Sequence, residues 1–307
     1  APVMTVDVDG LPLAAHGKQP GSDYNGHVRE RIHYPLIASC AGTGDMRAGL
    51  LRVGNAAPGA QAAAWIPGLV ARLRERGLAR TVRCRLDAGF TDGGTLEALD
   101  QAGIGYMGRL RDNAALDRHF NPHRRRGRGH PAERPREWTE ETRYRAASWQ
   151  RERRVVMVIR EHPAELFRRC FYLVTNLPAA THSGEQVFAL YRRRGKAEGH
   201  TGELKDTIGT SLPCTSRGRA SATEVFARAQ ALLPLRLLAY ELLHVLRAKM
   251  EAVTGHGWSL RRLRERVLKA AAQLQRHARR LHVILECRAA RLWRQLLKRR
   301  HRWRLAA

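Results

Sequence analysis

The sequence has few of the residues and segments that build disulfide frameworks, metal clusters or membrane proteins. Its five cysteines, among 307 residues, are odd in number and occur without close pairs. This pattern fits neither a disulfide framework nor a zinc cluster, and it suits a reducing cytosol. No run of about eighteen apolar residues is present, and the N-terminus lacks the basic and apolar regions of a signal peptide. We therefore expect a cytoplasmic protein that does not interact with a membrane.

Several motifs of common enzyme classes are also missing. The sequence contains no P-loop, no GxGxxG ahead of a helix, no HExxH and no GxSxG. The fourteen histidines show no metal-ligand spacing, and no internal repeat of about twenty to fifty residues is present. Nucleotide-binding, zinc-peptidase and serine-hydrolase functions are therefore not indicated.

Acidic residues are strongly outnumbered. The chain carries 28 Asp and Glu against 55 Lys and Arg, a net charge of +27. Most of the excess is arginine, whose planar guanidinium suits phosphate better than the point charge of lysine. This balance predicts a polyanionic partner, with nucleic acid as the first candidate. The length is enough for one large domain or two ordinary ones.

Two predicted strands end in an aspartate. Met4–Gly10 alternates apolar and polar residues, which places Asp7 and Asp9 on one face with Asp9 nearer the end. Thr81–Leu86 alternates in the same way and is followed by Asp87. Acids at the point where a strand enters a loop are well placed for chemistry in α/β sheets. The alternative is an aspartate that only stabilises a turn.

The other patterns predict an α/β chain followed by a helical region. Short strands between Glu137 and Thr175 indicate an insertion with a small sheet of its own. Heptad-like spacing in the C-terminal region predicts that its leucines, Leu274 and Leu281 among them, are packed. The remaining expected elements are a hairpin of Arg31–Ala41 and Met46–Val53, helices over Ala60–Arg76 and Gly94–Ala102, a strand over Ile104–Leu110, a basic loop between Asn113 and Pro135, a helix over Gly184–Lys205, an apolar helix over Ala222–Val253 kinked at Pro234, and basic amphipathic helices over Leu260–Trp303.

The stretch YRRRGKAEGHTGELK places four functional side chains at fixed intervals. On a helix, Tyr191, Arg194 and Glu198 share a face, and Lys205 lies two turns beyond Glu198. An acid among phosphate-seeking cations suits an enzyme that holds a metal ion against a DNA backbone. The alternative is a solvated, salt-bridged surface helix, because these spacings are common on surfaces.

Three acids could converge at one edge of the predicted sheet. Asp9 and Asp87 lie at strand ends, and Glu198 lies on the helix that follows. Three carboxylates there would hold one or two Mg²⁺ or Mn²⁺ ions, which prefer oxygen ligands. Two such ions about 4 Å apart activate the attacking oxygen and stabilise the leaving oxygen in phosphodiester displacement.

These residues resemble the DDE transposases of bacterial insertion sequences, in the subgroup whose ribonuclease H-like core is interrupted by a β-rich insertion. Tyr191, Arg194, Glu198 and Lys205 match that subgroup's Y-(2)-R-(3)-E-(6)-K motif at all four positions. RLDAGF, at residues 85–90, resembles its second-acid motif, and VDVDG with the following HGKQ and YNGH resembles its first. The resemblance covers nearly the whole chain.

The resemblance implies both a fold and a division of the chain. We expect an α/β fold with a ribonuclease H-like mixed sheet, flanking helices, a small β-rich insertion and a helical C-terminal region. Gly10 and Leu11 stand where the family commonly has small hydroxyl residues, and Gly199 stands where it commonly has asparagine. The expected parts are the first part of the catalytic core at 1–111, the β-rich insertion at 112–178, the rest of the core at 179–253 and a basic helical region at 254–307.

The resemblance also implies a reaction and its residues. Asp9, Asp87 and Glu198 would bind two Mg²⁺ or Mn²⁺ ions, with Asp7 as the competitor for the first position. Hydrolysis at the transposon end would release a 3′-OH that attacks target DNA, within a homodimeric synaptic complex on double-stranded DNA. The residues that would contact the backbone of the transposon end are Tyr191, Arg194 and Lys205.

Three further expectations concern the chain as a whole. The family usually carries a further N-terminal region, so the early first strand predicts an N-terminally truncated copy. A bacterial protein of this kind would be associated with the nucleoid. Two other functions remain open: a DNA-binding remnant without catalysis, and a nuclease on the same core without strand transfer.

Overall fold

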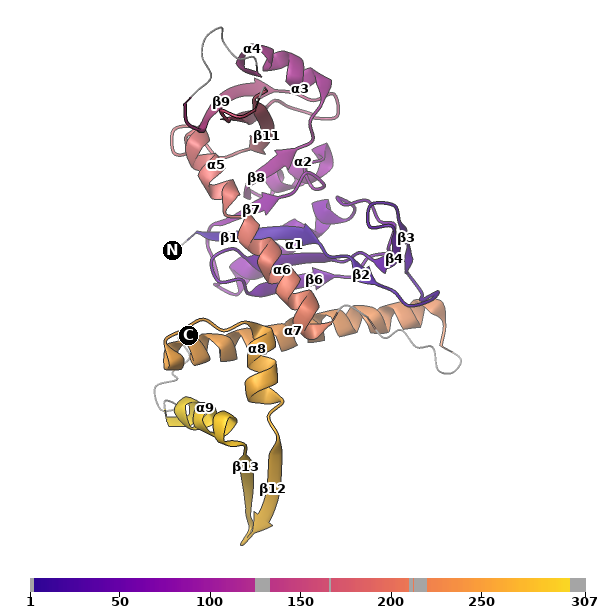
Figure 1. Cartoon of the computed structure of the whole chain (residues 1–307). Helices are drawn as coiled ribbons and strands as arrows, with labels where there is room; N and C mark the ends of the chain where they lie inside the picture. Colours follow the sequence, from indigo (N-terminus) through magenta and orange to yellow (C-terminus); the bar gives the residue numbers. More distant parts are fainter. Residues whose placement is uncertain (1–2, 125–132, 166, 210–211, 213–219, 299–307) are drawn as a thin grey trace.

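The computed structural model describes residues 3–124, 133–165, 167–209, 212 and 220–298 (Figure 1). Its centre is an eight-stranded mixed sheet with the strand order β6-β5-β1-β7-β8-β11-β10-β9. The strands of this sheet are β1 (Met4–Gly10), β5 (Leu36–Cys40), β6 (Met46–Leu50), β7 (Val82–Leu86), β8 (Gly105–Leu110), β9 (Arg136–Tyr144), β10 (Arg153–Glu161) and β11 (Arg169–Thr175).

Strand β1 lies inside the sheet and is covered on both faces. Val6 and Val8 have no exposed surface, and Asp7, which points to the other face, is only 2% exposed. β1 pairs antiparallel with β5 and parallel with β7, and β7 pairs parallel with β8. The antiparallel strands β6, β5 and β1 are thus followed in the sheet by β7 and β8, which run parallel to β1. This is the strand order that a ribonuclease H-like sheet requires. The expected fold class is confirmed.

Helices cover the two faces of the sheet. One face packs against α1 (Ala62–Glu75), which connects β6 to β7, and α2 (Gly93–Gln101), which connects the parallel strands β7 and β8. Asp92 caps α2 by accepting a hydrogen bond from the Thr95 amide at 2.9 Å. The opposite face packs against α5 (Gly184–Arg192) and α7 (Ala222–Thr254).

The strands of the expected insertion continue the main sheet, so the expectation of a separate small sheet is wrong. β11 pairs antiparallel with β8, and β10 lies between β11 and β9. The pairing with β11 provides hydrogen-bond partners for the backbone N–H and C=O groups of β8, which would otherwise be unpaired at the edge of the sheet. Within residues 113–135, two short helices replace part of the expected basic loop: α3 (Ala114–His119) and α4 (Asn121–Arg124). The remainder of that basic loop, residues 125–132, lies outside the described part of the chain.

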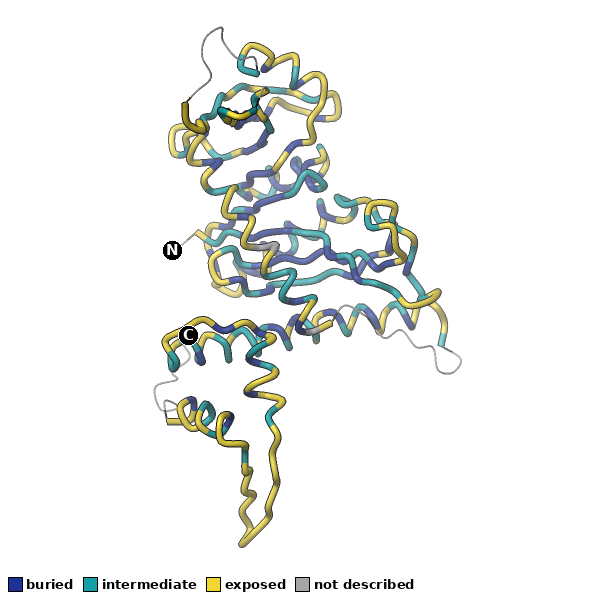
Figure 2. Tube along the Cα trace, viewed as in Figure 1, coloured by how far each residue is buried: buried dark blue, intermediate teal, exposed yellow. Residues whose placement is uncertain are grey.

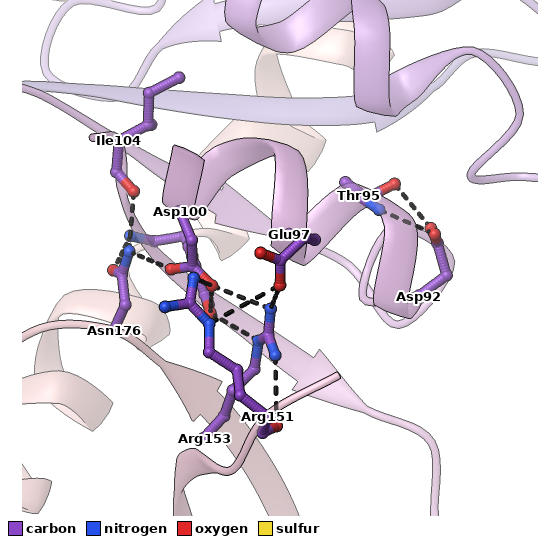
Figure 3. A network of polar contacts seen from close by, with 9 residues as sticks. Asp92, Thr95, Glu97, Asp100, Ile104, Arg151, Arg153 and Asn176 are labelled. Atoms are coloured by element: carbon purple, nitrogen blue, oxygen red, sulfur yellow. Dashed lines mark hydrogen bonds and ion pairs between the residues drawn. The ribbon is translucent and has the colours of Figure 1, made fainter. Parts of the chain in front are cut away.

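Ion pairs join this sheet extension to α2 (Figure 3). Arg153 of β10, which is almost fully buried, lies 3.0 Å from Glu97 and 2.9 Å from Asp100. Arg151 reaches Asp100 at 2.8 Å, and the Asn176 amide donates to the same carboxylate at 3.0 Å. β9, β10 and β11 are therefore fixed to the rest of the fold by buried charge as well as by backbone pairing.

The expected helix over Gly184–Lys205 is two helices. α5 ends at Arg192, and α6 (Gly195–Ile208) begins after a break at Arg193 and Arg194. Ser183 and Gln186 form a capping box that starts α5. The two helices follow one another along the same face of the molecule (Figure 1).

Helix α7 is 33 residues long and runs beneath the sheet (Figure 1). Its length and hydropathy reach those of a membrane span, which the sequence analysis did not expect. Its buried side, which includes Leu233 and Leu237, packs on Gly49 of β6 in the manner of a core helix. Pro234 lies inside the helix without ending it.

The C-terminal region is only partly helical. It contains α8 (Leu260–Leu263), the π-helix η1 (Arg264–Leu268) and α9 (Cys287–Lys298). Between η1 and α9 lies an antiparallel hairpin of β12 (Ala272–His277) and β13 (Arg280–Leu285). Leu274 and Leu281 are 66% and 65% exposed, so the expectation that they are packed in a helix is wrong.

The first hairpin is shorter than expected. β5 and β6 form it, and residues 31–33 instead belong to a separate small sheet. That sheet has the order β2-β4-β3 and lies beside the end of β1. Its strands are β2 (Leu13–Ala14), β3 (Asp23–Asn25) and β4 (Glu30–His33).

Candidate active site

Asp9 and Asp87 lie at the same edge of the sheet. The register pairs Val8 with Leu86, so the two aspartates follow directly on neighbouring parallel strands, which are about 4.8 Å apart. One carboxylate oxygen of each is held by the backbone. The Gly10 amide donates to Asp9 Oδ1 at 2.9 Å, and the Ala88 amide donates to Asp87 Oδ1 at 2.7 Å. The backbone amide that follows each aspartate therefore fixes the orientation of its carboxylate.

Arg194 lies against this acidic edge. Its Nη2 is 3.1 Å from Asp9 Oδ2, and the residue is 8% exposed. Burial lowers the pKa of the guanidinium, but the charges of Asp9, Tyr191 and Asp87 together raise it above its ordinary value. The sequence predicted a contact with the DNA backbone for Arg194, whereas this structure places it against an acid. It supplies the positive charge that the neighbouring carboxylates require.

Asp7 has a different environment. Both of its oxygens accept hydrogen bonds from Arg85, at 2.6 Å each, and both side chains are 2% exposed. Arg85 also donates to the Leu190 carbonyl of α5 at 2.9 Å. The pair therefore joins β1, β7 and α5 within the core. This geometry leaves Asp7 without a free oxygen at the sheet edge and favours Asp9 as the first acid.

Two tyrosines border the acids. Burial raises the pKa of the Tyr191 hydroxyl, and the nearby Asp87 raises it further against the opposing effect of Arg194. Burial and the charge of Asp9 also raise the pKa of Tyr34. A side chain at Gly10 would have its Cβ 2.6 Å from the Tyr34 ring, so glycine is needed for this approach. Both hydroxyls remain protonated at neutral pH.

The sequence analysis did not identify Tyr34 as a site residue. The available signal was the expected hairpin strand over residues 31–41: β1 pairs antiparallel with β5, so the residues that precede β5, Tyr34 among them, lie near the end of β1. The Arg52 guanidinium lies 5.1 Å from the centre of the Tyr34 ring, and it donates a hydrogen bond to the Tyr34 carbonyl at 2.8 Å. Three further bonds from Arg52 to the carbonyls of residues 57, 58 and 60 fix the loop before α1.

Glu198 and Lys205 lie on α6. The backbone of Glu198 is helical, but its side chain lies outside the described part of the structure. Lys205 is half-buried, two turns further along the helix. Glu203 holds α6 in place, because it accepts hydrogen bonds from Arg247 of α7 at 2.6 Å and from the Leu260 amide of α8 at 2.8 Å.

The residues at this edge suit a hard cation. Asp9 and Asp87 are neighbouring carboxylates, and a positive group, the Arg194 guanidinium, already lies against one of them. Oxygen donors of this kind are what Mg²⁺ and Mn²⁺ prefer. Among the described side chains, which exclude that of Glu198, no three acidic, histidine or cysteine residues form a metal-ligand group. Asp9 and Asp87 are thus the two acids of the expected set whose side chains the structure describes.

The chain was compared with protein families, curated proteins and solved structures. The family described as transposase DDE domain group 1 matches residues 1–303. The fold is similar to a piggyBac transposase in a synaptic complex with hairpin DNA, seen by cryo-EM, with 13% identity and a TM-score of 0.48. That similarity covers 86% of this chain and 52% of the other, so the chain spans about half the length of that transposase. A search of the curated proteins found no match.

Proposed function

The chain belongs to the family of transposase DDE domains of group 1, and on that premise we propose that it cleaves DNA at transposon ends and joins them to target DNA. The observation that carries the proposal is the pair of aspartates, Asp9 and Asp87, on neighbouring strand ends of a ribonuclease H-like sheet. We propose Glu198, on α6, as the third acid of the set. We propose residues 1–111 and 179–253 as the catalytic core.

The proposed site binds a divalent metal ion. Enzymes of this family generally use such ions, and Asp9, Asp87 and Glu198 would hold one or two of Mg²⁺ or Mn²⁺. A bound ion would supply the Lewis acid that activates the attacking oxygen and neutralises charge on the leaving oxygen.

The cleavage step is a displacement at phosphorus. The oxygen of water forms a bond to the scissile phosphorus, and the bond from phosphorus to the 3′ oxygen breaks. Water gives up a proton and the leaving oxygen gains one, which yields a 3′-OH and a 5′-phosphate. In strand transfer the same 3′-OH attacks a target phosphodiester and releases a new 3′-OH there.

The other residues of the site position the DNA backbone. The hydroxyls of Tyr191 and Tyr34, kept protonated by their raised pKa, donate hydrogen bonds to phosphate oxygens. Lys205 contacts a phosphate as a point charge. Arg194 balances the charge of Asp9 in the free protein and turns towards the scissile phosphate when DNA binds. The partner is double-stranded DNA, held by a homodimer, in the cytoplasm at the nucleoid.

A cleavage assay tests the proposal. The chain is incubated with DNA that carries the terminal repeats of its own element, with Mg²⁺ and, separately, with EDTA. We expect 3′-end nicking that EDTA abolishes and that Glu198→Gln reduces at least about 100-fold, or about 2.7 kcal/mol of transition-state stabilisation. Nicking by Glu198→Gln at the rate of the parent would contradict the role of this acid. Nicking without joining to target DNA would instead indicate a nuclease.

DNA binding should weaken steeply with added salt. With a net charge of +27 and several phosphate contacts, the logarithm of affinity should fall linearly with the logarithm of salt concentration. Replacing Lys205 with alanine should lower the slope by about 1, as expected for one lost phosphate contact. Fluorescence anisotropy on a short duplex at several salt concentrations measures this slope. An unchanged slope for Lys205→Ala would place this lysine away from the DNA.

A further inference from the structure

Helix α7 carries an exposed apolar stripe. Leu235, Leu238, Leu242 and Val245, at spacings of three and four residues, lie on one side of the helix and are 60%, 54%, 64% and 50% exposed. We call these four residues the α7 stripe. They belong to none of the packed clusters in the described part of the chain. An apolar face of this extent usually marks a contact site.

A second exposed apolar surface lies on the hairpin of β12 and β13, which we call the arm. The register places Ala272 opposite Leu285, Leu274 opposite Val283, and Arg276 opposite Leu281. Opposed residues share a face, so one face of the arm is apolar except for Arg276 near the turn. The other face carries Gln273, Gln275, His277, Arg280, His282 and Ile284.

The arm is a two-stranded hairpin with an exposed apolar face, so we expect that contact with another surface stabilises it. Its apolar face is open to solvent along almost its whole length (Figure 2). An isolated two-stranded hairpin is at best marginally stable in water, and a third strand or a packed helix is needed to stabilise it. The arm also extends away from α7 of its own chain (Figure 1), so it does not cover the α7 stripe.

We propose that the arm of each chain docks its apolar face on the α7 stripe of a second copy of this chain. The two surfaces match in length. The eleven residues of helix from Leu235 to Val245 span about 15 Å, and a six-residue strand spans about 17 Å. Neither surface offers the row of cations that DNA would need, although the chain as a whole carries +27. Surfaces with a single charge, that of Arg276, are where two copies of so basic a protein can approach with least repulsion.

Reciprocal docking closes the assembly. Each arm binds the α7 stripe of the other copy. A two-fold symmetric dimer therefore covers both arms and both stripes, and no surface remains exposed on which a third copy could bind. The inference rests on the proposed function in one respect. The docking of arm on stripe would be the protein contact within the homodimer that holds two transposon ends.

Sedimentation of the full chain in high salt and without DNA tests the docking. We expect a dimer for the parent chain. Leu238→Asp with Leu242→Asp in the stripe, or Leu274→Asp with Val283→Asp in the arm, should weaken the dimer at least about 100-fold, because each buries unpaired charge. Leu78→Asp, at a leucine that is 51% exposed and distant from both surfaces, should leave the dimer intact. Circular dichroism checks that each variant is folded.

A mixture of the stripe variant and the arm variant tests whether the dimer forms by docking of the arm on the α7 stripe or by other contacts. Reciprocal docking leaves one intact arm-and-stripe pair in the mixed dimer, so the mixture should dimerise more tightly than either variant alone. A monomeric parent chain, or an arm variant that dimerises as well as the parent, would overturn the proposal. Asp87→Asn should still dimerise, so a failure of DNA cleavage and a failure of arm docking remain distinguishable.

Discussion

Replacing Asp87 with asparagine is expected to reduce DNA cleavage at least about 1,000-fold, or about 4 kcal/mol of transition-state stabilisation. The amide keeps the shape of the carboxylate and can still accept the hydrogen bond from the Ala88 amide. It removes the negative charge that a divalent cation requires as a ligand. Asp9→Asn should have a comparable effect. Single-turnover cleavage rates under saturating Mg²⁺ measure both.

A matched control lies five residues further along the chain. Asp92 caps α2 through the Thr95 amide and hydroxyl, and asparagine is an equally good cap. Asp92→Asn should therefore cleave DNA at the parental rate and unfold at the parental temperature. Affinity for DNA should be retained in all three variants. Parental cleavage by Asp87→Asn would remove this acid from the site, and with it the main support for the proposed function.

Replacing Arg85 with leucine is expected to lower the free energy of unfolding by about 3–5 kcal/mol, the usual effect of breaking a buried ion pair. The substitution leaves the Asp7 carboxylate buried and without its two hydrogen bonds. It also removes the donor to the Leu190 carbonyl, which ties the sheet to α5. Equilibrium denaturation in urea, followed by circular dichroism, measures the change.

Two further variants isolate the buried pair. Arg83→Leu, two residues earlier on the same strand, removes only a contact with the Thr5 hydroxyl and should cost less than about 1.5 kcal/mol. The double variant Asp7→Leu with Arg85→Leu should recover most of the lost stability, since paired buried charges are often replaceable by apolar residues. A double variant less stable than Arg85→Leu alone would show that Asp7 has a stabilising partner other than Arg85.

The parts of the fold that depend on local pattern were predictable from the sequence. Alternation located β1 and β7, and the aspartates at their ends fell side by side because parallel neighbours end at the same edge. The strand order of the core followed from the resemblance. The ion pair of Arg194 with Asp9 was not predictable from the sequence. The spacing of a motif does not determine which charged group a long, flexible side chain will contact in the fold.

Long-range pairing accounts for the errors. Nothing in the local sequence distinguishes strands that form a new sheet from strands that extend an old one, so the pairing of β11 with β8 was missed. Leu274 and Leu281 are seven residues apart, which suits a helix, but the turn at residues 278 and 279, where both φ angles are positive, reverses the chain. The break between α5 and α6 is a local error: it lies just before Gly195, whose low helix propensity was visible in the sequence but did not by itself predict a break.

The contact between Gly10 and Tyr34 couples two positions that are 24 residues apart in the chain. A Cβ at residue 10 would lie 2.6 Å from the tyrosine ring, so no larger residue fits there while the ring remains. A small hydroxyl residue at position 10 would therefore require the Tyr34 ring to turn away or to be replaced by a smaller side chain. A substitution at position 10 is thus coupled to the conformation or the size of the side chain at position 34.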